Sequence, residues 1–276
     1  MRNFETGRAS EPGIGTDRCT PLIIGNNSWP TAMGRALPMT GGMGRGKTCN
    51  KLLLGMAPED RARLEPLLSS ENLASRQYLE RRGEWQVKIY FIESAVVSNL
   101  ETSDIPVPLE VGVVGCEGIV GASAICKLLP QRDSRVQIAG DALALEREAF
   151  QKQLDASPSL LHYLLRYIQT QIVQLSLAAS AGVRATVQQR LARKLLMYHD
   201  RIGNDDLPLT HENMSVIMGV RRASITQAIH NLEAELWIKA QRGRIHIRNR
   251  RGLAEYCGPF YGVAEAHYAE IMGHEG

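Results

Sequence analysis

The chain has 276 residues and a formal net charge of +3, and 44% of its residues are hydrophobic, which is enough for about two packed domains. No apolar run approaches the roughly 18 residues that span a bilayer. The N-terminus also lacks the basic-then-apolar pattern of a signal peptide, so we expect a cytoplasmic protein without a membrane partner. The five cysteines show no C-x-x-C spacing, which argues against a disulfide framework, a structural zinc or a compact iron–sulfur site, and we predict no metal site and no cofactor.

Residues 1–49 differ in composition from the rest of the chain. They are rich in Gly, Pro, Ser, Thr and Asn and show almost no periodic apolar pattern. Such a composition buries too little apolar surface to fold, and it predicts a disordered tail. Met33, Met39 and Met43 are alternative starts, so the natural length of this tail stays open.

One motif in the tail resembles a phosphate-binding loop. Residues Gly41–Thr48 satisfy the pattern G-x-x-x-x-G-K-[ST]. A working loop of this kind follows a buried strand and opens a helix, so that backbone N–H groups converge on phosphates. The preceding residues contain Pro30 and Pro38 and no β pattern. We therefore expect no nucleotide site here, and nucleotide hydrolysis is kept only as an alternative function.

Residues 50–72 are predicted to be helical because leucines recur through them, and Pro58-Glu59-Asp60 suits the first turn of a helix. From about residue 75 to residue 150 the period changes to two. Apolar residues alternate in short runs, as in 87–91, 107–113 and 136–138, and turn residues separate the runs. Short strands at this spacing predict an antiparallel barrel or roll.

Residues 158–186 are predicted to form one long helix. Apolar residues recur along it at alternating spacings of four and three, which defines an a/d seam over about three heptads. This seam favours a left-handed pairing with a second copy of the chain. The alternative is that the helix packs only against the β domain. The predicted dimer interface consists of Leu161, Leu165, Ile168, Ile172, Leu175 and Ala179.

Residues 209–247 are the most informative part of the sequence. They predict a short helix that Thr210 caps, a sharp turn at Gly219, a second helix and a small hairpin. In the second helix the apolar side chains share one face, which predicts that this face is buried. Its members are Ile225, Ala228, Ile229 and Leu232.

The opposite face of the second helix carries Ala223, Thr226, Gln227 and His230, and Arg221-Arg222 stand at its start. No hydrophobic core needs these groups outward, whereas a DNA major groove does, since Arg pairs with guanine and Gln with adenine. Residues 221–251 hold eight Arg or Lys and two Glu, a net charge of +6 in a chain of +3. The positive charge is therefore concentrated in one module, as an electrostatic footprint for DNA requires.

These residues resemble the Crp/Fnr family of transcription regulators. The resemblance spans roughly residues 50–270 and is most specific at the C-terminal end. The matching segments there are 209–212 (LTHE), 218–222 (MGVRR), 242–245 (RGRI) and, upstream, 190–196 (RLARKLL) and 200–201 (DR). Segments 90–94 (YFIES) and 113–121 (VVGCEGIVG) are similar to the family's N-terminal β-roll.

The resemblance implies an α+β fold: a cyclic-nucleotide-binding-like β-roll at residues 50–157, a dimerisation helix and hinge at 158–202, and a winged helix-turn-helix at 203–276. It implies a homodimer bound to double-stranded DNA at a pseudo-palindromic operator, with RNA polymerase as a further partner. We expect base-edge contacts from Arg222, Ala223, Thr226 and Gln227. We expect phosphate contacts from Thr210, Arg221, Ser224, Arg242 and Arg244.

The family's effector cassette is degenerate in this sequence. The family holds the ribose of cAMP with a Gly-Glu pair and the phosphate with an Arg and a Ser or Thr. Here Gly121 is followed by Ala122, which carries no carboxylate. Arg132 keeps the phosphate position, whereas Arg135 stands where the hydroxyl is expected and Asp133 adds an anion. We therefore expect a regulator that does not respond to cAMP. Haem, an iron–sulfur cluster, a small organic effector and no effector at all stay open as alternatives.

No Ser/His/Asp or Cys/His arrangement stands out in the sequence, so we expect no catalytic activity. One more alternative function is kept. It is a ligand-controlled interaction module whose basic domain contacts DNA without sequence preference, and it predicts no specificity ratio between operator and scrambled DNA.

Overall fold

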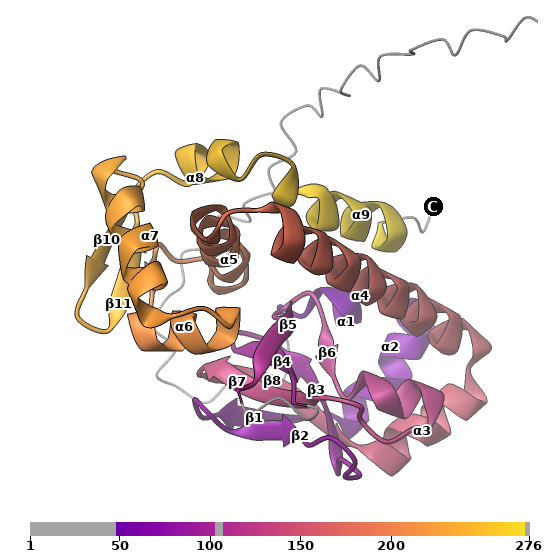
Figure 1. The fold of residues 1–276 in the computed structure, drawn as a ribbon. Helices are drawn as coiled ribbons and strands as arrows, with labels where there is room; N and C mark the ends of the chain where they lie inside the picture. Colours follow the sequence, from indigo (N-terminus) through magenta and orange to yellow (C-terminus); the bar gives the residue numbers. More distant parts are fainter. Residues whose placement is uncertain (1–47, 103–106, 274–276) are drawn as a thin grey trace, which may run out of the picture. The chain divides into compact units, whose positions relative to one another are not determined.

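The computed structural model describes residues 48–102 and 107–273, which belong to one compact unit of the chain, residues 33–276 (Figure 1). Seven residues of the loop-like motif, Gly41–Lys47, lie outside the described residues. Thr48 and Cys49, which the sequence assigned to the tail, both bind Glu93: the Thr48 hydroxyl donates to its carboxylate, and the Cys49 N–H donates at 2.6 Å.

The helix that follows Thr48 is α1 (Lys51–Leu54), and it is only four residues long. Asn50 caps it by accepting from the Leu53 N–H at 3.1 Å. The Asn50 amide also donates to the Ile92 and Gly118 carbonyls at 2.8 Å each. This short, separately capped helix gives no support to a phosphate-binding loop at Thr48. Two further short helices follow, α2 (Pro58–Leu64) and η1 (Glu65–Leu67).

Two four-stranded antiparallel sheets form the β-roll. The first has the order β1-β8-β3-β6, with bounds Ser69–Leu73, Gly140–Glu146, Lys88–Ile92 and Ile119–Val120. The second has the order β2-β7-β4-β5, with bounds Tyr78–Glu80, Asp133–Ile138, Val96–Glu101 and Leu109–Val114. Apolar residues from both sheets, among them Leu73, Ile92, Val97, Val114 and Val136, form a shared core.

Helices cover the outer face of the first sheet. They are α1, α2, η2 (Ala122–Cys126), α3 (Arg147–Ala156) and the N-terminal part of α4 (Pro158–Arg184). Their apolar side chains, including Phe150 and Tyr167, pack with Phe91 of β3 in a second core. The Tyr167 hydroxyl lies 3.2 Å from the Ile119 N–H, which joins α4 to β6. The predicted β domain and long helix are therefore both present.

The predicted seam of α4 faces away from the roll. Leu165 and Ile172 are 45% and 50% exposed, and Ala179 is also exposed. Leu161, Ile168 and Leu175 are half-buried, the first two against the second core. The opposite face, which includes Leu160, Leu164 and Tyr167, is buried on the roll. The apolar seam and the face that packs on the roll are thus two different faces of α4.

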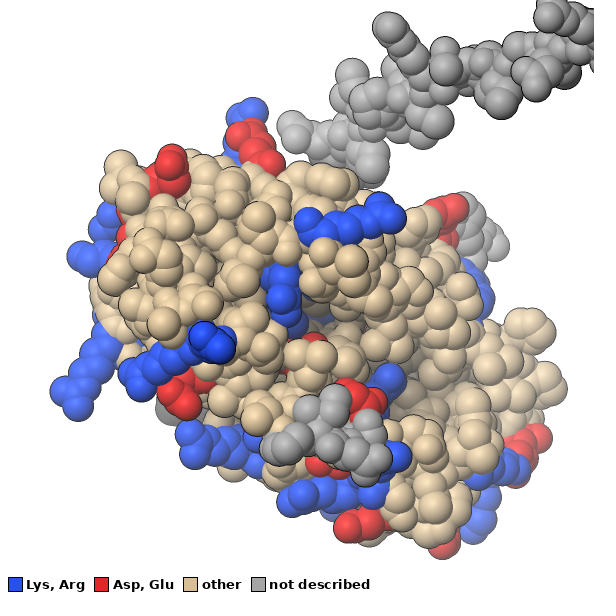
Figure 2. Space-filling view, viewed as in Figure 1, with Lys and Arg blue, Asp and Glu red and all other residues tan. Residues whose placement is uncertain are grey.

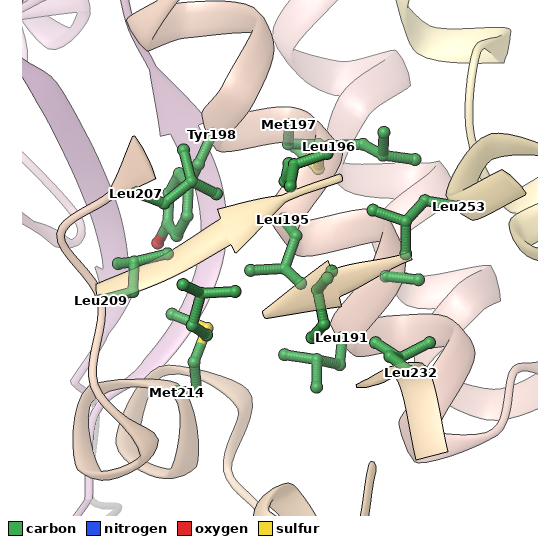
Figure 3. Close-up of a cluster of buried hydrophobic side chains, with 14 of the residues drawn as sticks. Leu191, Leu195, Leu196, Met197, Tyr198, Leu207, Leu209, Met214, Leu232 and Leu253 are labelled. Atoms are coloured by element: carbon green, nitrogen blue, oxygen red, sulfur yellow. The ribbon is translucent and has the colours of Figure 1, made fainter. Parts of the chain in front are cut away.

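The stretch 158–202, interpreted from sequence as one dimerisation helix and hinge, contains two helices. α4 ends at Arg184, and α5 (Val187–Ile202) begins after Thr186, which forms a reciprocal capping box with Gln189. Leu191 and Leu195 of α5 are fully buried in the core of the helix-turn-helix (Figure 3). α5 therefore packs as part of the DNA-binding domain.

The rest of this domain follows in order: β9 (Asp206–Leu207), α6 (His211–Met218), α7 (Arg222–Ala234), β10 (Ile238–Gln241), β11 (Arg244–Ile247) and α8 (Arg250–Cys257). The three strands pair in the order β10-β11-β9. Side chains from α5, α6, α7 and α8 meet in one core, which includes Met214, Leu232 and Leu253 (Figure 3).

After η3 (Gly258–Phe260), a last helix, α9 (Val263–Met272), lies along α4 (Figure 1). The Arg166 guanidinium of α4 donates to the Ile271 carbonyl at 2.8 Å, and the Tyr268 hydroxyl donates to the Glu117 carbonyl at 2.6 Å. The sequence placed these residues in the winged domain, whereas they pack on α4 and the roll. No helix within the described residues is long and apolar enough to cross a membrane.

Candidate nucleic-acid interface

The turn between α6 and α7 has the geometry that the sequence predicted. The Thr210 hydroxyl accepts from the Asn213 N–H at 3.1 Å and so caps α6. Gly219 ends α6 with a φ of +63°, where any other side chain is strained. A Cβ at Gly219 would also lie 3.0 Å from the Leu109 Cδ1. The glycine therefore sets the angle between the two helices.

The second helix, α7, has one buried and one open face. Ile225, Ala228, Ile229 and Leu232 are buried in the domain core, as predicted. On the other side, the predicted DNA-contacting residues Arg221, Arg222, Ala223 and Gln227 are exposed, and Ser224 and Thr226 are half-buried. The structure thus brings these six residues together on one helix.

The N-terminus of α7 is open to an anion. Arg221 stands at the N-cap with an extended backbone, and within the described residues no side chain caps the helix there. The first-turn N–H groups of a helix have no partner inside the helix, and the helix dipole places partial positive charge beside them. Such a terminus suits a DNA phosphate. The flanking Arg221 and Arg222 add full charges at the same point.

Polar contacts organise the open face of α7. The Gln227 amide donates to the Asn231 Oδ1 at 2.9 Å, and Asn231 donates to the Gln188 Oε1 of α5 at 3.1 Å. The Thr226 hydroxyl lies 3.3 Å from the His211 Nδ1. Burial, together with the charge of nearby Arg222, lowers the pKa of His211. Sequence reasoning missed Gln188 and Asn231, because their link joins residues 43 positions apart.

The wing is the hairpin of β10 and β11, in which Ile238 pairs with Ile247. Gly243 at its tip has a φ of +78°, and Arg242 and Arg244 on either side are exposed. The Arg244 guanidinium donates to the Gln241 Oε1 at 2.7 Å. Figure 2 shows Lys and Arg side chains projecting from the side of the molecule where α7 and the wing lie in Figure 1.

Comparison with known families identifies this module. Residues 189–256 match the model of the Crp-like helix-turn-helix domain, which spans α5 to α8. The chain is therefore a DNA-binding transcription regulator that carries a Crp-like helix-turn-helix domain. The match begins within α5, in agreement with the packing of that helix in the winged core.

Solved structures share the fold of the regulator. A protein from Eubacterium rectale assigned to the Crp/Fnr family is 16% identical, with a TM-score of 0.60, over 76% of this chain and 98% of that one. FixK2 from Bradyrhizobium japonicum is 13% identical, with a TM-score of 0.59, over 67% and 95%. The c-di-GMP-responsive regulator CLP from Xanthomonas campestris is 16% identical, with a TM-score of 0.55, over 69% and 99%. None of the curated proteins matches the chain.

The roll of the regulator holds a carboxylate that the sequence comparison missed. Gly121, with a φ of +103°, and Ala122 begin η2, and Ala122 offers no carboxylate. The carboxylate of Glu80, from β2, instead lies beside η2. It accepts from Ser123 at 3.1 Å and from Ser134 at 2.7 Å, and burial raises its pKa. Glu80 precedes the cassette by some forty residues, so no local motif indicates it.

Strand β7 places Ser134 and Arg135 on opposite faces. Ser134 is fully buried and contacts the Asn99 Oδ1 at 2.9 Å. Arg135, which the sequence placed at the hydroxyl position, lies on the other face of β7 with its guanidinium 5.8 Å from the Tyr78 ring. Asp133 accepts from the Arg82 N–H at 2.8 Å. Ser134 therefore lies beside Glu80, and Arg135, the residue that the sequence placed at the hydroxyl position, lies on the opposite face of β7.

Arg132, which the sequence placed at the phosphate position, lies near Glu80. Its side chain is half-buried, and its charge acts on Glu80, whose pKa it lowers against the larger effect of burial. Ser123 and Ser134 both donate to the Glu80 carboxylate. The cassette of the regulator is thus a hydrogen-bonded network of its own side chains.

Two buried ion pairs join the roll to α5. Glu110 of β5 pairs with Lys194 and also accepts from the Tyr198 hydroxyl, at 2.5 Å, and from Ser98. Seven residues further along both segments, Glu117 lies 2.6 Å from the Arg201 guanidinium. Burial lowers the pKa of Lys194, although Glu110 opposes this effect. These pairs attach the first helix of the DNA-binding domain to the roll.

Proposed function

We propose that the regulator binds DNA as a homodimer and reads sequence through α7. The observation that carries this proposal is the exposed polar face of α7 directly after an uncapped helix N-terminus. On this proposal Arg222, Ala223, Thr226 and Gln227 contact base edges, because these side chain types complement major-groove patterns. Thr210, Arg221, Ser224, Arg242 and Arg244 contact phosphates, which set orientation without reading sequence.

The dimer of this proposal forms through α4. Its seam residues are exposed or half-buried, although they are apolar and spaced as in a two-helix coil. A second copy placed against Leu165 and Ile172 would remove this apolar surface from water. A two-fold dimer then presents two α7 helices to the same side of a duplex.

Selection from a random pool of DNA duplexes tests this function. Purified full-length protein is expected to enrich a pseudo-palindrome whose half-site centres lie about 34–36 Å apart, or a multiple of that distance. Enrichment of one asymmetric half-site would contradict the dimer. Binding without any enriched sequence would favour the non-specific interaction module.

We also propose that cAMP is not the effector. The Ser134 hydroxyl already donates to the Glu80 carboxylate at 2.7 Å, so it is not free to bind a ligand phosphate. A buried carboxylate beside a cyclic phosphate would also repel it. Calorimetric titration with cAMP is expected to give no heat of specific binding. Saturable binding at micromolar concentration would overturn this proposal.

The proposed function includes no catalysis and places the regulator in the cytoplasm, where it meets DNA and, as a further proposed partner, RNA polymerase. The alternative of nucleotide hydrolysis has a direct test. ATP hydrolysis by the full chain that disappears on truncation to Lys51 would favour it.

A further inference from the structure

A cavity of about 370 Å³ lies between β5 of the roll, α4, and the helices α5 and α6 of the DNA-binding domain. Its volume falls in the range of small-molecule sites, about 300–1,000 Å³. It is separate from the cassette, because none of the residues around it comes from β2, η2 or β7. Its walls combine a mainly apolar lining with basic groups from α5.

The apolar wall leaves space for a ligand because most of the residues that α4 contributes to it are small. Ala178, Ala181 and Gly182 face Leu109 and Ile217 across the cavity. A Cβ built on Gly182 would meet nothing within 4 Å. Ala178 lies one turn from Gln174 and Ala181, which are both buried, so it stands on the roll side of α4. Leu175 and Ala179 of the proposed seam also line the cavity, at its edge toward the seam.

The charged wall favours an anion. Arg190, Arg193 and Lys194 line the cavity from one face of α5, against a single carboxylate, Glu110. Both Glu110 oxygens already accept, one from Lys194 and the other from Tyr198 and Ser98. One amino group of the Arg190 guanidinium donates to the Met218 carbonyl at 2.9 Å. Arg190 therefore has further donors for a carboxylate or phosphate.

We propose that this cavity binds a small organic anion with an apolar body, such as a medium-chain carboxylate. The anion pairs with Arg190, and its apolar part lies along Leu109, Ile217 and the small residues of α4. Because Ile217 and Met218 belong to α6, an occupant contacts the helix-turn-helix directly. Occupancy then changes the affinity for DNA, a consequence that rests on the proposed function.

The first test compares two probes of equal length and opposite charge. Sodium octanoate and octylammonium chloride are titrated into the full-length protein, followed by calorimetry and thermal unfolding. Octanoate is expected to bind saturably and to raise Tm, and octylammonium is not. Equal effects of the two probes, or no saturable binding of octanoate, would overturn the proposal.

Two variants locate the site. Arg190→Gln is expected to weaken octanoate binding at least tenfold, since it removes the charge that pairs with the carboxylate. Ala178→Met fills the cavity from the roll side and is expected to abolish binding. Arg184→Gln, at an exposed arginine outside the cavity, is the matched control and keeps wild-type binding. Wild-type binding by Ala178→Met would show that octanoate binds elsewhere.

Two outcomes separate this proposal from its rivals. If octanoate binds a monomeric variant but not the wild-type dimer, a second copy of the chain fills the cavity and the proposal is wrong. DNA binding is measured on the same samples. Protein that binds its operator but not octanoate contradicts only the cavity, whereas protein that binds octanoate but no DNA contradicts only the proposed function.

Discussion

Ile172→Lys is expected to convert the regulator from a dimer to a monomer. Ile172 lies at the centre of the α4 seam and is 50% exposed on one chain. In the proposed dimer it meets its symmetry mate, so the variant places two like charges in an apolar contact, at a cost of several kcal/mol. Size-exclusion chromatography with light scattering measures the mass, and operator affinity is expected to fall with it.

Val87→Lys is the matched control for this variant. Val87 is another exposed apolar residue, in the roll and outside the seam. It is expected to remain dimeric and to bind DNA as the wild type does. A dimer that persists in Ile172→Lys would refute the assignment of α4 as the interface.

Lys194→Met is expected to destabilise the chain by about 3–5 kcal/mol, because it leaves the buried Glu110 carboxylate without its cation. Urea denaturation at neutral pH measures the loss. Adding Glu110→Gln removes the orphaned charge and is expected to recover most of the stability. The difference in stability between the single and the double variant thus measures how much the Glu110 pair contributes to holding α5 on the roll.

An exposed ion pair provides the control. Lys127 and Asp155 lie 2.8 Å apart, and their side chains are 56% and 62% exposed. Lys127→Met is expected to cost no more than about 1 kcal/mol, since solvent screens the pair. A loss for Lys194→Met no larger than that for Lys127→Met would mean that the Glu110 pair does not hold the two domains together.

Local patterns were sufficient to predict the DNA-binding module. The Thr210 cap, the turn at Gly219 and the buried face of α7 each depend on residues within one or two helical turns. The alternation of β3 also depends on near neighbours. Such features are decided by backbone conformation and amphipathic period, which a sequence states directly.

Features that depend on distant packing were missed. β4 is buried along nearly its whole length, so it shows no alternation to detect. β1, in the other sheet, is polar and was taken for part of a helical stretch. The position of Glu80 beside Ser134 depends on β2 and β7 pairing across 54 residues. Which of Ser134 and Arg135 lies beside Glu80 depends on the same pairing, since side chains alternate along a strand.

The boundary of the DNA-binding domain illustrates the same limit. α4 and α5 are both amphipathic helices, and only two residues separate them. The sequence shows that both helices bury an apolar face, but it does not show which part of the molecule each face packs against. The burial of Leu191 and Leu195 in the winged core assigns α5 to the DNA-binding domain.

The central claim is that α7 reads bases while the wing holds phosphates. Gln227→Ala and Arg244→Ala, both at exposed positions, separate these roles. Each variant is titrated against the selected operator and a scrambled duplex at two salt concentrations. Gln227→Ala is expected to lose about 1–3 kcal/mol at the operator alone and to relax one base position in each half-site.

Arg244→Ala is expected to weaken binding to both duplexes by a similar factor and to lower the salt slope by about one for each lost contact. The account predicts this contrast between the two variants. It is contradicted if Gln227→Ala weakens both duplexes equally while Arg244→Ala changes the base preference.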